Sequence, residues 1–431
     1  MNYSKSWLKS KIQYCDQSKW CFLFMAVIPI SPQQSLIPVQ PTNIGQTTPK
    51  LTVLPPLALY VHIPWCVRKC PYCDFNSHQA QDDIPEALYL QALRADLEQS
   101  LPLIWGRKIT SIFIGGGTPS LFSAGAIDRL LADIRALLPV LPDAEITLEA
   151  NPGTVEAEKF RAFRESGINR LSLGIQTFND RHLQSLGRIH SAANARDAVQ
   201  VAQRYFERFN LDLMFALPGQ TQEECLADLR QALAFDPLHL SCYQLTLESN
   251  TLFAKYPPPA LPDEDLAFDM QQAIEAELAQ KNFIHYEVSA YARPGYLCQH
   301  NLNYWQFGDY LGIGAGAHGK ISFSNRIIRQ VKQRHPRTYM ETALAGDPLQ
   351  SQHDIPMCEL PFEFMLNALR LNQGVALKSF AAYTGLSVAE LLPKLELAQA
   401  RGLLVSDLNT LQPTLLSRRF LSDLQAIFLA D

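Results

Sequence analysis

Between residues 57 and 281, short apolar runs alternate with longer segments whose apolar positions recur at i, i+3 and i+4. The apolar runs span residues 57–63, 111–114, 145–148, 170–175, 211–216 and 238–245. The helical periodicity covers residues 84–99, 126–138, 156–166, 192–204, 222–235 and 264–281. Six successive strand–helix units predict a parallel sheet with helices outside it, either doubly wound or rolled into a barrel. In both forms, ligands bind at the C-terminal ends of the strands.

After about residue 338 the pattern changes to helices with few strands. Helical periodicity covers residues 358–371, 377–384, 388–400 and 416–429, and residues 403–405 and 410–412 predict a strand–turn–strand. Helices followed by a small hairpin are typical of a winged-helix module. This stretch is not strongly basic, so we expect it to pack or act as a lid rather than to bind DNA. We predict one α/β domain over residues 57–340 and a small helical domain over residues 341–431.

Residues 1–56 precede the first predicted strand. Residues 31–56 are rich in Pro, Gln and Thr and lack hydrophobic periodicity, which is typical of a linker. The apolar run at 20–30 is interrupted by Pro29 and is shorter than the roughly 20 residues of a spanning helix, so no transmembrane segment is predicted. Four lysines precede that run, but no small-residue cleavage site of a signal peptide follows it. We expect a disordered extension, or translation that begins at Met25 or later.

Composition narrows the class of protein. A chain of 431 residues is long enough for about two to three domains, and 47% hydrophobic residues supply a sizeable core. The formal charge of 37 minus 42, or -5, gives no reason to expect a nucleic-acid partner. Nine cysteines are too dilute for a disulfide scaffold, and three of them fall within residues 66–73. Such thiolates need a reducing compartment, so we expect a cytoplasmic protein.

The three clustered cysteines, Cys66, Cys70 and Cys73, follow the first predicted strand with the spacing Cys-x3-Cys-x2-Cys. Thiolates on one short irregular loop can ligate three irons of a cubane cluster and leave the fourth iron for a non-protein ligand. The alternatives are a zinc site completed by His62 or His78, and cysteines that are buried incidentally. Structural zinc usually joins two separate cysteine pairs, and no second pair occurs here. The sequence therefore favours a cluster.

This spacing on the first strand–helix loop, with Phe75 close behind the last cysteine, resembles the radical S-adenosylmethionine (SAM) superfamily. The resemblance implies a partial (β/α)6 barrel that carries a 4Fe-4S cluster and SAM. In that superfamily the reduced cluster donates an electron to SAM, which yields methionine and a 5′-deoxyadenosyl radical. The protein's share of such chemistry is positioning and exclusion of water.

Polar or glycine-rich segments follow the next predicted strands. Gly115, Gly116 and Gly117 let the backbone approach a ligand closely and can offer N–H groups to it. Each of the later polar residues could alone be a solvated strand end, but together they line the mouth of successive strands. By the resemblance, the SAM-binding positions are Tyr60, Gly116, Gly117, Thr118, Glu149, Gln176, Arg188 and Asp212.

A second glycine motif, Gly314-Ala-Gly316-Ala-His-Gly319, matches G-x-G-x-x-G in form. A dinucleotide fingerprint requires a helix after the motif, whereas residues 320–324 predict a strand. We therefore expect no dinucleotide site here.

Within the superfamily, the chain resembles the branch that contains oxygen-independent coproporphyrinogen III oxidase (HemN) and the HemW heme chaperones. The oxidase pattern has a fourth cysteine where this chain has Phe75, as HemW does. The stretch His300-Asn301-Leu-Asn-Tyr304-Trp305 resembles the His-Asn-x-x-Tyr-Trp motif of HemW. His300 can ligate heme iron and the aromatics can contact a porphyrin. The alternative is that His300 and Asn301 bond to backbone while the aromatics pack in the core.

The resemblance implies a heme chaperone that binds a 4Fe-4S cluster, SAM and heme and passes heme to apo-proteins, and membrane-associated acceptors are compatible with it. The alternatives are an enzyme that decarboxylates coproporphyrinogen III, and a plain cluster-binding or zinc-binding scaffold. We expect the chaperone and assign no catalytic residue. A basic group could meet heme propionates, although a solvated face is the simpler interpretation: Arg326, Arg329, Lys332, Arg334 and Arg337.

Overall fold

The computed structural model describes residues 49–80, 83–154, 156–407 and 409–430. Its main feature is a 12-stranded sheet with the order β14-β13-β12-β11-β1-β4-β5-β6-β7-β8-β10-β9. Six neighbouring strands run parallel in chain order: β1 (Leu57–Ile63), β4 (Ile109–Gly116), β5 (Val140–Ala150), β6 (Arg170–Gln176), β7 (Arg208–Phe215) and β8 (His239–Gln244). The predicted α/β class with a parallel sheet is confirmed.

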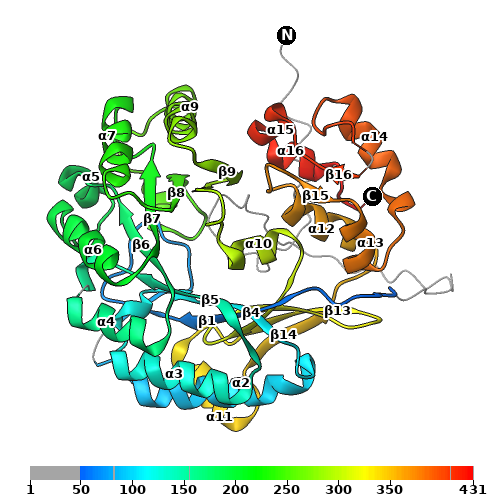
Figure 1. The fold of residues 1–431 in the computed structure, drawn as a ribbon, viewed down its shortest axis with the longest axis horizontal. Coiled ribbons are helices and arrows are strands. Elements are labelled where there is room, and N and C mark those ends of the chain that lie inside the picture. The colour runs from blue at the N-terminus through cyan, green and yellow to red at the C-terminus, as the bar shows by residue number, and fades with distance from the viewer. Residues whose placement is uncertain (1–48, 81–82, 155, 408, 431) are drawn as a thin grey trace.

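Helices cover the outside of these strands in an arc (Figure 1). They are α2 (Glu86–Ile104), α3 (Ala124–Leu137), α4 (Ala157–Ser166), α6 (Ala192–Tyr205), α7 (Gln222–Leu233) and α9 (Glu264–Gln280). Side chains of Ser123, Ser191 and Thr221 accept hydrogen bonds from the first turns of α3, α6 and α7. The main core lies between these helices and the sheet. Each helix returns the chain to the same edge, so the C-terminal ends of the strands meet on one side.

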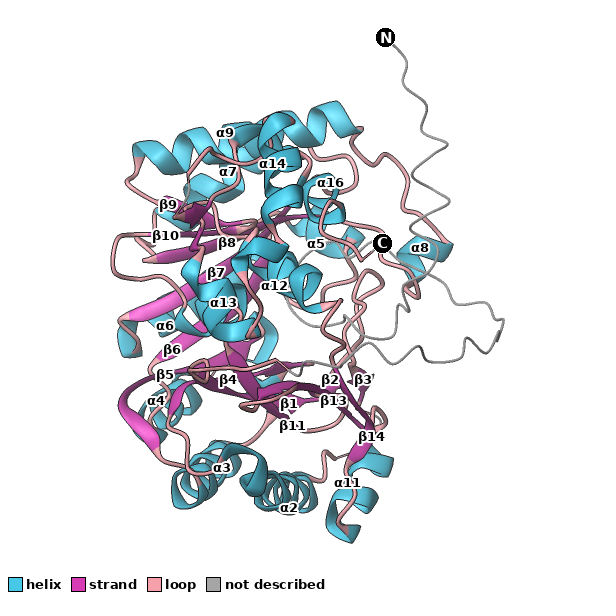
Figure 2. Cartoon of the chain, turned by 90° about the vertical axis from the view of Figure 1, so that its right-hand side faces the viewer, coloured by secondary structure: helices cyan, strands magenta, loops and turns pink. Residues whose placement is uncertain are grey.

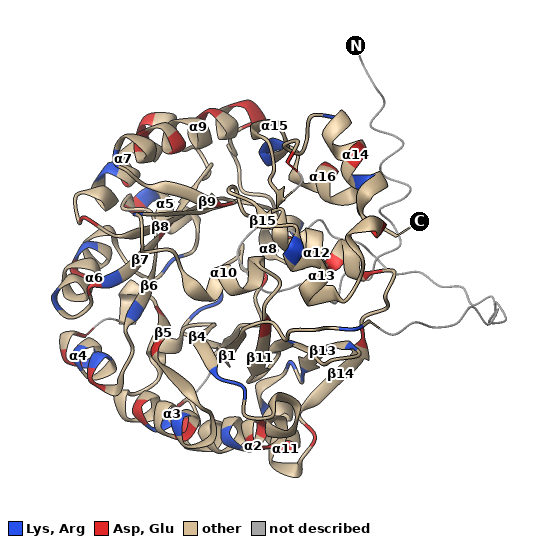
Figure 3. Ribbon diagram, turned by 45° about the vertical axis from the view of Figure 1, so that its right-hand side comes forward, with Lys and Arg blue, Asp and Glu red and all other residues tan. Residues whose placement is uncertain are grey.

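Further strands extend the sheet on both sides. On one side, β11 (Asp309–Ile313) pairs parallel with β1 and is followed by antiparallel β12 (His318–Ser322), β13 (Ile327–Lys332) and β14 (Leu349–Asp354). On the other side lie β10 (Ala290–Ala292) and β9 (Ile284–Glu287). The chain between β10 and β11 must cross from one side of the sheet to the other. It does so through α10 (Gln299–Trp305), which contacts β1, β4 and α12 and lies between the strands and the C-terminal helices (Figure 3).

The C-terminal region contains α12 (Leu360–Ala368), α13 (Lys378–Thr384), α14 (Leu392–Ala400), α15 (Leu415–Arg419) and α16 (Leu421–Ala426). Two predicted helices are interrupted. A 3-10 turn over Val388–Glu390 precedes α14, whose first turn contains Pro393 and therefore needs no N–H donor there. Phe420, with φ -123 and ψ 43, separates α15 from α16. These breaks divide each long amphipathic segment in two.

The predicted hairpin is present in a modified form. Val405 N donates to Gln412 O, and Leu404 bridges to Pro413. The second predicted strand, β16 (Thr410–Leu411), also pairs with β15 (Val375–Ala376), which the sequence pattern did not predict. A second core cluster joins these C-terminal helices to Tyr304, Trp305 and Phe307 at the end of α10.

The structure can be compared with the two predicted domain boundaries, at residue 340 and between residues 56 and 57. The boundary at residue 340 lies inside α11 (Pro336–Ala345), which packs against α2 and lies below β14 in Figure 2, and β14 follows it in the chain. Of the predicted extension, residues 1–48 lie outside the described residues. Leu51 is buried, and its N–H donates to Ser324 O. The boundaries stay predictions. None of the described helices is long and apolar enough to cross a membrane.

Candidate cofactor pocket

The cysteine loop leaves the C-terminal end of β1 and returns to it. Its two ends form a small parallel pair, β2 (Trp65–Cys66) with β3 (His78–Gln79). Between them, Cys73 N donates to Cys70 O in a tight turn. Lys69 Nζ crosses the loop and donates to Phe75 O at 3.0 Å and to Ser77 O at 3.2 Å. The loop is thus held from both ends and across its middle.

Asn76 fixes this loop to the glycine turn before β12. Its Nδ2 donates to Ala315 O at 2.9 Å and to Arg334 O at 2.8 Å. A Cβ on Gly316, whose φ is +75, would lie 2.4 Å from that Nδ2. The glycine motif precedes strand β12, as predicted. In the structure, the missing side chain of Gly316 leaves the space that Asn76 of the cysteine loop occupies.

His62 and His78, the alternative zinc ligands, lie near the cysteine loop and differ in burial and in hydrogen bonding. His62 is buried and uses both ring nitrogens, Nδ1 with Tyr60 Oη at 3.0 Å and Nε2 with Asn76 O at 2.9 Å. Burial lowers its pKa to about 4, so the ring is neutral at physiological pH. His78 is half-buried and packs edge-on against His335. Neither imidazole is presented to the three thiols as a ready ligand.

A pocket of about 730 Å³, part of it open to solvent, lies over the cysteine loop. Its lining brings together most of the predicted site residues: Cys66, Cys70, Cys73, Gly116, Gly117, Thr118, Glu149, Gln176, Arg188 and Asp212. They come from the ends of five parallel strands and the loops after them. Tyr60 and His300 do not line this pocket.

Each cysteine thiol has a polar neighbour. Thr118 Oγ1 donates to Cys66 Sγ at 3.5 Å, Arg188 Nη1 donates to Cys70 Sγ at 3.5 Å, and Ser77 Oγ lies 3.8 Å from Cys73 Sγ. Burial raises the pKa of the Cys66 thiol and raises that of Cys73 to about 12. A bound iron would replace these protons.

Among the described residues, no group of three or more His, Cys, Asp or Glu side chains is arranged to hold a single metal ion. A cubane cluster makes a different demand, because each thiolate binds a different iron. Three thiols on one loop, each with a donor beside it and all facing one pocket, fit that demand.

The glycine turn after β4 differs from expectation in one respect. The sequence analysis expects its N–H groups to meet a ligand, but they are used within the protein. Gly116 N donates to Glu149 Oε2 at 3.0 Å, Gly117 N to Ile63 O at 2.7 Å and Thr118 N to Trp65 O at 2.8 Å. A Cβ on Gly117 would lie 2.5 Å from Trp65 O. These glycines therefore bring β4 against the cysteine loop and leave room in the pocket.

Two carboxyl groups, of the half-buried Glu149 and the buried Asp212, face the same pocket. Burial, and next the nearby Asp212, raise the pKa of Glu149 to about 8. Burial also raises the pKa of Asp212, while hydrogen bonds from Asn210 and Ser172 act in the opposite direction. Acids in this state gain most from a cationic or hydroxyl-bearing ligand. The ammonium, sulfonium and ribose hydroxyls of SAM match this chemistry.

Glu149 gives the pocket a testable pH dependence. Its pKa is about 8 in the fold against 4.5 for the ordinary group, so the folded state holds the proton more tightly than the unfolded chain. The free energy of unfolding must therefore fall as pH rises from about 4.5 through about 8. We expect Glu149→Gln to remove this loss, so that the ligand-free variant melts higher than the wild type at about pH 9 and nearly level with it at about pH 5. Thermal denaturation across this range checks it.

Glu158→Gln, at an exposed site on α4, is the matched control and should follow the wild type at every pH. Parallel melting curves for Glu149→Gln and the wild type would show that Glu149 is ionised in the fold.

Strained backbone marks the ends of two neighbouring strands. Gln176 ends β6 with φ 68, and Ala216 follows β7 with φ 57, in the left-handed region that non-glycine residues rarely adopt. Gln176 Oε1 accepts a hydrogen bond from Tyr243 Oη on β8. Such strain concentrates at ligand sites, where the surrounding structure holds it.

The sequence analysis named Gln176 and Asp212 but missed other residues that line the pockets from the same strands and from β8. On β6, Arg170, Ser172, Gly174 and Gln176 alternate with buried apolar residues and face the interior; Asn210 and Asp212 do so on β7, and Ser241 and Tyr243 on β8. Successive strand side chains point to opposite faces, so a period of two from Gln176 and Asp212 would have found them.

His300 is placed in the interior of α10 with both ring nitrogens engaged. Nδ1 bonds with Ser111 Oγ at 3.0 Å and Nε2 with Tyr304 Oη at 3.1 Å, and the ring stacks on Phe113. Burial lowers its pKa to about 3. The geometry favours the alternative that His300 anchors α10 to β4, although the bonds are to side chains and not to backbone. Heme ligation by His300 stays a prediction and would require one of these bonds to break.

The predicted basic group does not form one face. Arg329 pairs with Glu363 at 2.7 Å, and Lys332, which is 2% exposed, pairs with Asp96. Arg337 pairs with Glu341 on the same helix. The expected solvated face is therefore wrong for Arg329 and Lys332, because the two residues lie on opposite faces of β13 and each pairs with an acid from another element.

The sequence and the fold match known families. The sequence profile of the radical SAM superfamily matches residues 60–232, and that of the HemN C-terminal domain matches residues 358–420. The structure of coproporphyrinogen III oxidase (HemN) from Escherichia coli aligns with a TM-score of 0.75 at 24% identity, covering 87% of this chain and 90% of that one. The class is therefore a radical SAM domain followed by a HemN-type C-terminal domain.

Sequence relatives narrow the class. Heme chaperone HemW of Escherichia coli (strain K12) is 50% identical over 380 residues, which cover 88% of this chain and 99% of the relative. HemW of Haemophilus influenzae is 50% identical over 384 residues with the same coverage. Radical S-adenosyl methionine domain-containing protein 1, mitochondrial, of Bos taurus is 38% identical over 74% of both chains. The chain belongs to the HemW family of the radical SAM superfamily.

Proposed function

We propose that this protein is a heme chaperone that carries a 4Fe-4S cluster and SAM, binds heme and delivers it to apo-proteins. The observation that carries the cofactor part is the convergence of three cysteine thiols and the two acids Glu149 and Asp212 in one pocket. The chaperone part is supported by relatives at 50% identity, which bear that name. The reducing cytosol, where cluster thiolates persist, is the proposed compartment, and membrane-associated acceptors are compatible with it.

In this proposal Cys66, Cys70 and Cys73 hold the cluster, and Arg188 lies beside the Cys70 thiol as a fixed positive charge. Glu149 and Asp212 receive the cationic and hydroxyl groups of SAM, while Gly116, Gly117 and Thr118 shape the wall beside it. Gln176, whose side chain accepts a hydrogen bond from Tyr243, lines the cofactor pocket on the side of β6 and β8. Tyr60 lies behind the glycine turn and orients His62. When bound, the cluster and SAM would supply one-electron chemistry, and the residues named here bind, orient and shield them.

The decisive experiment separates a carrier from a catalyst. We expect the anaerobically reconstituted protein to bind heme in a titration followed by Soret absorbance, and to leave coproporphyrinogen III unchanged in an anaerobic assay with SAM and reductant. In the same titration, unchanged affinity of His300→Ala would remove His300 as a heme ligand. Formation of protoporphyrinogen IX by the wild type would overturn the chaperone assignment and favour the oxidase.

A further inference from the structure

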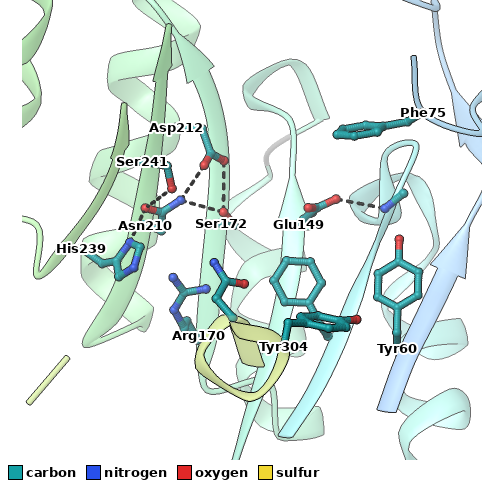
Figure 4. Close-up of a pocket in the computed structure, with 13 residues that line it drawn as sticks. Tyr60, Phe75, Glu149, Arg170, Ser172, Asn210, Asp212, His239, Ser241 and Tyr304 are labelled. Carbon is teal, nitrogen blue, oxygen red and sulfur yellow. Dashed lines mark hydrogen bonds between the residues drawn. The ribbon is translucent and has the colours of Figure 1, made fainter. Parts of the chain in front are cut away.

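A second hollow, of about 590 Å³, lies deeper in the barrel and shares Phe75, Gly116, Glu149, Ser172 and Asp212 with the cofactor pocket. We call it the inner chamber. Its other lining residues are Tyr60, Phe113, Arg170, Asn210, His239, Ser241, Asn301 and Tyr304. Helix α10 contributes the last two, so the chamber is bounded by the barrel strands and by the segment that crosses the sheet (Figure 4).

One side of the inner chamber is aromatic. Tyr60 and Phe75 stand on one flank with Tyr304 beneath them (Figure 4), and Phe113 stacks near Tyr60 at 6.3 Å between ring centroids. Aromatic rings offer flat apolar area at low conformational cost. This side suits a planar apolar ligand.

The opposite side is polar and mostly satisfied internally (Figure 4). Asn210 Nδ2 donates to Ser172 Oγ and Asp212 Oδ1, and its Oδ1 accepts from Ser241 Oγ and faces His239 Nδ1 at 2.7 Å. His239 Nε2 bonds with Tyr286 Oη at 2.8 Å. Because these groups already have partners, they offer little to a ligand.

Arg170 is the exception on this side. Its side chain is 4% exposed, yet among the described residues its guanidinium makes one hydrogen bond, a 3.5 Å contact from Nη1 to Thr147 Oγ1. The nearest carboxylate oxygen, Glu145 Oε2, lies 4.0 Å from Nε. A buried guanidinium normally binds a carboxylate with two parallel hydrogen bonds, and leaving its donors unused is costly. Asn301, half-buried on α10, also lines the chamber and adds an amide to its polar groups.

We propose that the inner chamber is the heme site and that Arg170, with Asn301, binds a heme propionate while the aromatic side contacts the porphyrin ring. This inference rests on the proposed function and deepens it. It assigns the His-Asn-x-x-Tyr-Trp segment a divided role: Asn301 and Tyr304 face the ligand, and His300 anchors the helix. It also places heme next to the SAM pocket, because the two hollows share Glu149 and Asp212.

The test is a cycle of two proteins and two ligands, followed by Soret titration: the wild type and Arg170→Gln, each with heme and with heme dimethyl ester. The ester keeps the ring and iron and lacks the propionate charges. We expect heme to bind the wild type at least about tenfold more tightly than the ester does, and Arg170→Gln to weaken heme by a similar factor with little effect on the ester. The wild-type comparison needs no substitution, so it stands even if Arg170→Gln folds poorly.

Two further variants sharpen the result. Asn301→Asp places a like charge at the half-buried end of the site and should weaken heme more than the ester. Thr147→Val removes the hydrogen bond that the Arg170 guanidinium makes within the described part of the chain, at nearly constant volume, and should leave heme affinity within about twofold. A circular dichroism melt of each variant reports folding separately.

Equal affinity of the wild type for heme and its ester would overturn the inference and leave the chaperone proposal standing. So would a loss of SAM affinity in Arg170→Gln with heme affinity unchanged, because the carboxylate would then belong to SAM. No heme binding by the wild type would overturn the proposed function itself, and this inference with it.

Discussion

A triple variant with Cys66→Ala, Cys70→Ala and Cys73→Ala is expected to retain no iron–sulfur cluster after anaerobic reconstitution. The three thiols face one pocket from one loop, and each would bind a different iron, so no other described cysteine can replace them. Cys225, Cys242 and Cys298 are buried elsewhere. Iron content per chain should fall to background, and the EPR signal of the reduced cluster, together with its response to SAM, should disappear.

The matched control is Cys358→Ala, which removes an exposed cysteine outside the pocket and should leave iron content and the EPR signal unchanged. The fold should persist in the triple variant, because the loop is held by Asn76, Lys69 and the β2–β3 pair and not by the thiols. Full cluster assembly by a folded triple variant would refute the central site assignment.

Replacing Gly117 with alanine is expected to damage both stability and cluster retention. The added Cβ would lie 2.5 Å from Trp65 O, 2.8 Å from Trp65 C and 3.0 Å from Pro64 C. All three are backbone atoms at the start of the cysteine loop, so no side-chain rotation relieves the contact. Gly117 N also donates to Ile63 O, which ties the glycine turn to the end of β1. The loop must shift, and we expect a destabilisation of about 2–4 kcal/mol, typical of overpacking and backbone strain.

Gly125→Ala is the control for this substitution. Gly125 lies in the first turn of α3, and a Cβ there would meet nothing within 4 Å. Alanine is favoured in helices by up to about 1 kcal/mol over glycine, so this variant should be as stable as the wild type or more so. Denaturant unfolding gives the stability difference, and iron content after reconstitution gives cluster retention. Normal stability and iron content in Gly117→Ala would show that the loop can yield.

The strand and helix order of the barrel was predictable because each element carries its own signal. The apolar runs at 57–63 and 170–175 appear as β1 and β6, and the helical periodicity at 192–204 appears as α6. The period of the hydrophobic pattern is set by the local geometry of a helix or strand, so it can be recognised without knowing the tertiary contacts. Of the added strands, β12 was indicated by residues 320–324, whereas β11, β13 and β14 were not predicted, because their pairing depends on residues far apart in the chain.

The site residues divide in the same way: those with a local sequence signal were predicted, and those that depend on distant contacts were not. Residues at strand ends, such as Glu149 and Asp212, were found because parallel strands end on one side of a sheet. Arg170, Asn210 and Ser241 lie deeper on the same strands, where a polar residue among apolar neighbours gives no sign of which face it occupies. The burial of His300, the use of the glycine N–H groups within the protein and the ion pairs of Arg329 and Lys332 depend on partners from other elements.

The sequence by itself determined the class of sheet, the cysteine spacing and the resemblance to the HemW branch, because these rest on local periodicity and residue spacing. The tertiary structure decided where the crossing segment α10 lies, which residues of its motif face inward to the barrel chamber, and which carboxyl groups have a raised pKa. Those features arise from desolvation and from contacts between residues distant in the chain, such as Glu149 with Gly116 and His300 with Ser111. Their energies exist only once the elements have packed together.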